Sequence, residues 1–226
     1  MAKQTKSASK SGSSRESSPR GNSSRNGSTT RENSGRQSDA RQQSQMAQGE
    51  MEMHSSVEKL FVDQLKDIYY VEKNLVKALS KMAKKATTQE LRDAFLEHQQ
   101  VTQGQMERLE QVFEYMGKKP QAKRCPVMDG LLEESEEMMN ETEDDTLTRD
   151  VALIVSGQKV EHYEIATYGC LVSLAKTYGM QEVADLLQET LDEEKEADES
   201  LTYIAENNVN YEAGQEDDEE SEEEEE

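Results

Sequence analysis

The sequence is poor in the residues that mark secreted, zinc-binding and membrane proteins. Its 226 residues include no tryptophan, three prolines and two cysteines, and only 33% are hydrophobic. Cys125 and Cys170 are too few and too far apart for a disulfide framework or a zinc ribbon, which favours a reducing compartment. No apolar run approaches the roughly 18 residues of a membrane span, and the N-terminus lacks the apolar core of a signal peptide. We therefore expect a cytoplasmic protein without a membrane contact.

Charge is distributed unevenly around a formal net value of −22. Residues 1–50 carry nine Lys/Arg and four Asp/Glu, whereas residues 212–226 carry eleven acids and no base. The segment between them is also strongly acidic, so a folded domain there would repel nucleic-acid phosphates. A nucleic-acid contact through the basic N-terminal segment is a weaker expectation than a merely solvated tail.

The apolar residues are concentrated in the middle of the chain. Residues 1–50 are Ser/Arg-rich and aperiodic, and residues 212–226 form a run of like charges, so both are predicted to be disordered tails. Residues 51–211 show helical periodicity throughout, and capping boxes begin at Ser55 and Thr87. The expected helices span residues 55–85, 87–117, 127–140, 146–179 and 181–206.

Turn lengths predict how these helices are connected. Short turns join the first two and the last two long helices, which makes each pair an antiparallel hairpin. About thirty residues separate the hairpins and include the short helix near 127–140. The predicted fold is all-α, a ferritin-like four-helix bundle with one long crossover that carries a short extra helix.

Each long helix is polar at mid-length on its otherwise apolar stripe. Glu72 interrupts the first stripe, Glu161 the third and Glu194 the fourth. The second stripe has three consecutive polar members, His98, Thr102 and Gln105. Glu164 lies one helical turn after Glu161 and Asp198 one turn after Glu194, each on the edge of its stripe. The candidate metal ligands are therefore Glu72, His98, Glu161, Glu164, Glu194 and Asp198.

Several carboxylates facing one another in a bundle core need a compensating charge. No Lys or Arg occupies the stripe positions, which leaves bound metal or several protons. Carboxylate oxygens with some imidazole suit two divalent ions, with iron or manganese favoured and zinc as an alternative. Each residue also has a structural interpretation: His98 could be an ordinary core histidine, and Glu164 and Asp198 could face solvent.

Five blocks of the sequence resemble the YciF-type family of bacterial ferritin-like, stress-associated proteins. They include LRDAFLEHQQVTQGQMERLEQVF, CPVMDGLLEE and QKVEHYEIATYGCL, and together they cover about 150 residues in the family's order. The resemblance implies a ferritin-like bundle, usually a homodimer, in a class whose activity is poorly defined. The EHYE block is also similar to that of rubrerythrin, which implies that Glu161 and Glu164 are both metal ligands.

The broader ferritin-like superfamily implies ligand roles for Glu72 and Glu194, but two helices depart from its pattern. Its Glu-x-x-His motif of the second helix would fall on Thr102 and Gln105, and the fourth helix has Asp198 in place of a histidine.

Two main functional hypotheses follow from these observations. The first is a stress-associated protein that binds a dinuclear metal and handles peroxide or other oxidants; if it is an enzyme, it is a di-metal oxidoreductase. The alternative is a non-enzymatic structural or interaction protein with a vestigial metal site.

Overall fold

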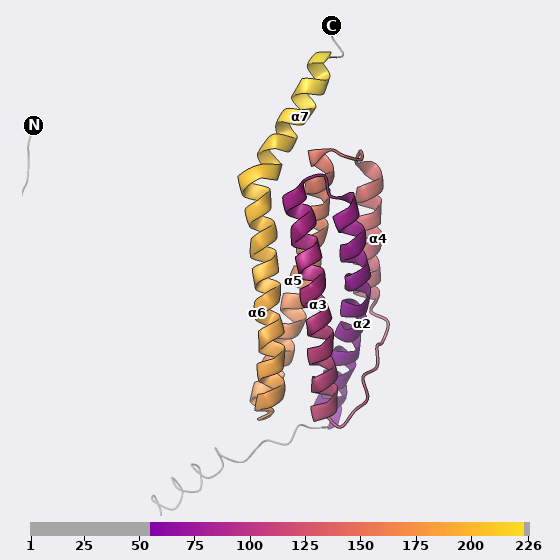
Figure 1. The fold of residues 1–226 in the computed structure, drawn as a ribbon. Helices are drawn as coiled ribbons and strands as arrows, with labels where there is room; N and C mark the ends of the chain where they lie inside the picture. Colours follow the sequence, from indigo (N-terminus) through magenta and orange to yellow (C-terminus); the bar gives the residue numbers. More distant parts are fainter. Residues whose placement is uncertain (1–54, 224–226) are drawn as a thin grey trace, which may run out of the picture. The chain divides into compact units, whose positions relative to one another are not determined.

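Two helical hairpins pack side by side in the computed structural model, which describes residues 55–223 (Figure 1). The first hairpin consists of α2 (Ser55–Lys85) and α3 (Gln89–Tyr115), and the second of α5 (Leu147–Thr177) and α6 (Gln181–Ile204). The connection between them carries α4 (Pro126–Glu141). No strand occurs among residues 55–223, and the predicted ferritin-like bundle with one long crossover is confirmed. The predicted tail at residues 1–50 lies outside the described residues.

The start of α5 meets the turn between α2 and α3. The backbone N–H groups of Thr87 and Thr88 donate to the two carboxylate oxygens of Asp150, at 2.6 and 2.8 Å. The Thr87 hydroxyl donates to the carbonyl oxygen of Thr146 (2.7 Å). The helices α3 and α5 therefore begin at the same end of the bundle, which is why the crossover must return along its length.

The same contacts explain a shift of one residue in the cap of α3. The sequence predicted Thr87 as the capping residue, but the Thr88 hydroxyl accepts the Leu91 N–H instead (3.4 Å). Thr87 is engaged with the second hairpin, so its side chain does not cap α3. As predicted, α3 and α5 end next to glycines, and Gly117 and Gly179 have φ values of +63° and +70°.

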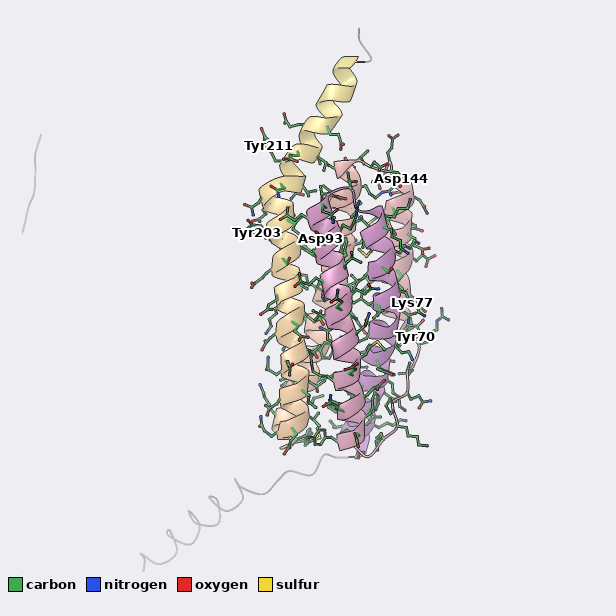
Figure 2. All side chains as sticks on the ribbon, viewed as in Figure 1. Tyr70, Lys77, Asp93, Asp144, Tyr203 and Tyr211 are labelled. Carbon is green, nitrogen blue, oxygen red and sulfur yellow. The ribbon has the colours of Figure 1, made fainter. Side chains whose placement is uncertain are left out.

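We expect the replacement of Asp150 by alanine to destabilise the bundle by about 3 kcal/mol, because two backbone N–H groups would lose their buried acceptor. Urea denaturation followed by circular dichroism would measure the loss. Asp93, an exposed aspartate on α3 (Figure 2), provides the control, and Asp93→Ala should change stability by less than about 0.5 kcal/mol. Equal effects of the two substitutions would contradict the role given to Asp150.

The crossover lies against α2 and α5. Tyr70 of α2 (Figure 2) donates its hydroxyl to Asp129 of α4 at 2.7 Å, and Lys81 pairs with Glu136 at 2.6 Å. Before α4 begins, the N–H of Lys123 donates to the carbonyl oxygen of Lys66 (2.9 Å). These contacts cover the outer side of the α2–α5 pair and bury Met128 and Met139 of α4.

Residues 212–223 of the C-terminal acidic segment are helical, where the sequence predicted disorder from residue 212. The helix α6 passes through a π-helical turn, η1 (Ala205–Val209), into α7 (Asn210–Glu223). Val209 and Ala213 are buried, and the Glu216 carboxylate accepts the N–H of Leu147 at the start of α5 (2.7 Å). These tertiary contacts stabilise the helix against the repulsion between its acids. The charge pattern, taken alone, had predicted disorder.

The predicted stripes form the core on three helices. Glu72 on α2 and Glu194 on α6 are buried together with the large apolar residues at helical spacing around them. On α3 the apolar residues before His98 and after Gln105 are packed in the core. The helix α5 differs because α2, α4 and α6 all pack against it. Val160 and Glu164 are buried there beside Glu161, whereas Gln158 and Ile165 on the same helix are only half-buried. None of the helices in residues 55–223 is long and apolar enough to cross a membrane.

Candidate metal centre

Four glutamates from three helices lie in the middle of the bundle. Glu72 belongs to α2, Glu161 and Glu164 to α5, and Glu194 to α6, and each is at most 1% exposed. His98 of α3 joins them, with 10% of its side chain exposed. Helical periodicity on α2 and α6 brings each acid inward among apolar neighbours, so the four helices together place five ionisable groups in one layer.

These residues form two groups of three that share a member. Ligand atoms of His98, Glu161 and Glu194 lie within 4.8 Å of one another, and the same holds for Glu72, Glu164 and Glu194. A carboxylate has two oxygens, so Glu194 could serve as a ligand in both groups. We call these groups the histidine triad and the glutamate triad.

The atoms that face the centre lack hydrogen-bond partners. They are Nε2 of His98, both carboxylate oxygens of Glu164 and of Glu194, and Oε2 of Glu72 and of Glu161. His98 Nε2 is 3.4 Å from Glu161 Oε1 and 3.6 Å from Glu194 Oε2. Buried polar groups in folded proteins are nearly always partnered. So many unpaired acceptors and one imidazole nitrogen fit a site that holds divalent cations.

Burial changes the protonation of the acids in the absence of metal. Desolvation raises the pKa of Glu72 to about 8, although the hydrogen bond from Tyr168 and the charge of His98 act in the opposite direction. Desolvation also raises the pKa of Glu164 and of Glu194 well above the usual value, and repulsion from neighbouring carboxylates adds to it. Without metal the centre therefore holds protons that a divalent cation would displace.

The metal-free protein should lose thermal stability as the pH rises from about 5 to 8. The folded pKa of Glu72, about 8, exceeds its unfolded value, so the stability that protonation gives is present at low pH and lost as the pH rises through the folded pKa. Calorimetry in a chelator should show the melting temperature falling by on the order of 5 °C. Glu72→Gln should have a shallower pH dependence, and a melting temperature that rises over this range would contradict the prediction.

A tyrosine supports the glutamate triad. Tyr168 of α5 is fully buried, and its hydroxyl donates to Oε1 of Glu72. That bond leaves Oε2 of Glu72 buried and without a hydrogen-bond partner. Tyr163, five residues earlier, has its hydroxyl 3.2 Å from the Cys125 sulfur instead. Tyr168 is thus the tyrosine that orients a candidate ligand.

The helix α3 contributes only His98 to the two triads. Thr102 and Gln105, where the superfamily pattern has its ligands, are fully buried. The Thr102 hydroxyl donates to the carbonyl oxygen of His98 (2.8 Å), and Gln105 Nε2 donates to Glu193 (3.1 Å). His98 lies one turn earlier and reaches the shared Glu194 from there.

Asp198 belongs to neither triad. Its carboxylate accepts a hydrogen bond from Gln158 (3.4 Å) and lies 3.3 Å from His162 Nε2 near the surface. Four residues of an α-helix turn through about 400°, so Asp198 is rotated by about 40° from Glu194. The structure therefore assembles five of the six candidates, with Asp198 outside.

Arg108 is a charged residue of this region that the stripe analysis missed. It lies beside Leu109 on α3, and only 13% of its side chain is exposed. Its guanidinium donates to the Thr190 hydroxyl and to Glu193 of α6. Its positive charge partly offsets the rise that burial causes in the pKa of Glu72. The aliphatic stem of arginine lets the charge reach inward from a flanking position, which a stripe count does not register.

Comparison with known proteins gives one family and several close relatives. The family described as a domain of unknown function, DUF892, matches residues 56–214. Protein YciF of Escherichia coli K12 is 45% identical over 159 residues, which cover 70% of this chain and 95% of YciF. The crystal structure of YciF, an E. coli stress protein, aligns with a TM-score of 0.66 over 70% of this chain and 99% of that one. YcfI of Rhodopseudomonas palustris, described as a candidate structural protein, aligns at 41% identity and a TM-score of 0.63, over 66% of this chain and 94% of its own.

Proposed function

The chain belongs to the DUF892 family and is a relative of YciF, and on this premise we propose that it is a stress-associated ferritin-like protein that binds two divalent metal ions. Iron or manganese is the favoured metal, because the candidate ligands are hard carboxylate oxygens with one imidazole. The observation that carries the proposal is Glu194, a fully buried carboxylate with two unpaired oxygens that belongs to both triads.

Each triad would hold one ion. His98 and Glu161 would bind the first, Glu72 and Glu164 the second, and Glu194 both. Bound iron or manganese would supply one-electron redox chemistry toward peroxide or another small oxidant. The chain would supply the site itself: Tyr168 orients Glu72, and the packed core on both sides of the layer excludes water.

Anaerobic titration with Fe(II), followed by metal analysis after desalting, would test the proposal. We expect about two ions per chain, and about one in Glu161→Ala because the histidine triad would lose a ligand. Retention of less than about 0.3 ion per chain, unchanged in Glu161→Ala, would rule out a specific centre. Peroxide consumption by the iron-loaded protein then tests the oxidant chemistry separately.

A second candidate function is that of a non-enzymatic structural or interaction protein. The observation that favours it is the replacement of strong ligands by Thr102 and Gln105 on α3, which leaves the centre with fewer protein ligands than the superfamily pattern. The double variant Glu72→Leu/Glu194→Leu separates the two functions. Under our first proposal, cells that carry the double variant lose protection against oxidants. Under the second, the double variant is more stable than the unmodified protein and protects cells as well as it does. The homodimer and the cytoplasmic location remain predictions.

A further inference from the structure

A groove lies between α3 and α6 on the outside of the bundle, over the candidate centre. The two helices lie side by side (Figure 1) and pack against each other. The groove has a volume of about 200 Å³. That is room for at least about six water molecules, at roughly 30 Å³ each, and thus for a hydrated ion. Its lining consists of small or acidic side chains and one histidine: Ala94, Glu97, His98, Val101, Glu193, Glu196, Ala197 and Ser200.

His98 belongs both to this groove and to the buried centre. Its ring lines the groove, while its Nε2 is buried, lacks a hydrogen-bond partner and faces Glu161 and Glu194. Two other depressions, near Gly117 and between α2 and α4, contain no residue of either triad. The imidazole of His98 therefore lies between the groove and the carboxylates of the centre.

The rim of the groove carries two exposed carboxylates that form no ion pair among residues 55–223, Glu97 and Glu196. The third acid, Glu193, differs because Arg108 and Gln105 both bind it. A cleft lined by charge of one sign concentrates counter-ions and raises their association rate by about 10- to 1,000-fold. The free acids at the rim would attract cations, whereas Glu193 is held by its two partners.

We propose that this groove is the entry site through which divalent cations reach the buried centre. Glu97 and Glu196 would bind the incoming cation transiently at the surface, and the cation would pass the imidazole of His98 to reach the inward-facing Nε2 of that residue and Glu194. This inference rests on the proposed metal-binding function. It adds that the rim acids determine how fast the centre loads and do not determine how tightly it holds the ion, since they are not part of either triad.

The test is the rate of Co(II) uptake by the full-length chain, followed by visible absorption in a stopped-flow instrument. In Glu97→Gln/Glu196→Gln we expect the association rate to fall by about tenfold, with the dissociation rate falling in parallel so that stoichiometry and equilibrium affinity are unchanged. The matched control is Glu107→Gln/Glu114→Gln, which removes the same charge from exposed positions around the depression near Gly117. It should load at the rate of the unmodified protein, and thermal melting should show that both variants are folded.

The outcomes separate the entry site from the centre. If both double variants bound Co(II) at equilibrium as the unmodified protein does and also took it up at the unmodified rate, the entry site would be overturned and the metal centre would stand. Equal slowing of both variants would also overturn it, because the effect would then come from overall charge. Absence of Co(II) binding by the unmodified protein would overturn both the entry site and the metal centre.

Discussion

Glutamine in place of Glu194 should weaken the binding of both metal ions by at least about 100-fold, because this one carboxylate belongs to both triads. Glu161→Gln should weaken mainly the ion of the histidine triad, and the other ion only through the coupling that the shared Glu194 provides. Isothermal titration with Mn(II) would show two sites in the unmodified protein, one strong site in Glu161→Gln and none in Glu194→Gln.

Asp198→Asn is the matched control for this experiment, since it removes an acid one turn further along the same helix. Asp198 contacts Gln158 and His162 near the surface, so its replacement should leave both sites unchanged. If one strong site survived in Glu194→Gln, the assignment of Glu194 to both metal sites would be wrong. If Asp198→Asn lost a site, the assignment of Asp198 outside the triads would be wrong.

Methionine in place of Glu164 should have opposite effects with and without metal. Both oxygens of Glu164 are buried and unpaired, and replacing such a group by an apolar side chain of similar volume stabilises a core by about 1–4 kcal/mol. At pH 8 the metal-free variant should therefore melt about 5–10 °C higher than the unmodified protein. With saturating Mn(II) the order should reverse, because a ligand has been removed and the stabilisation by bound metal is smaller.

The gain from Glu164→Met should shrink at pH 5. Burial raises the pKa of Glu164, so folding at pH 8 must either bury a charge or bind a proton from solvent, and this cost becomes smaller at low pH. Differential scanning calorimetry at the two pH values, with and without Mn(II), gives all four melting temperatures. Glu114→Met, at an exposed position of α3, controls for the substitution itself. If the Glu164→Met variant melted lower than the unmodified protein in every condition, the buried Glu164 carboxyl group would not destabilise the metal-free fold.

The fold and the position of the centre could be predicted because both follow from periodicity along single helices. Glu72 and Glu194 interrupt regular apolar stripes, and the structure buries both of them completely. Glu164 was harder to place, because a single stripe does not describe a helix that packs on several sides. Asp198 follows Glu194 at nearly the same spacing as Glu164 follows Glu161. The spacing therefore does not show that Glu164 is directed into the bundle and Asp198 toward the surface, which depends on how each helix is packed.

The remaining differences depend on contacts between residues far apart in the chain. The cap of α3 moved to Thr88 because Asp150, more than sixty residues later, binds the turn. The helix α7 forms in an acidic segment because Glu216 binds the start of α5 and Ala213 is buried. Arg108 enters the bundle edge because Thr190 and Glu193 of α6 accept its hydrogen bonds. No local pattern of charge or periodicity contains these pairings.

The carboxylate common to both triads makes occupancy of one position depend on occupancy of the other. Binding of the first ion would remove the proton from Glu194 and fix its orientation, so the second ion would meet a carboxylate that is already ionised and in place. Thermodynamic linkage makes this coupling reciprocal. When metal is scarce, a population of molecules would then divide into empty and fully loaded members with few half-loaded ones, and the protein would respond to metal supply more as a threshold than as a graded buffer.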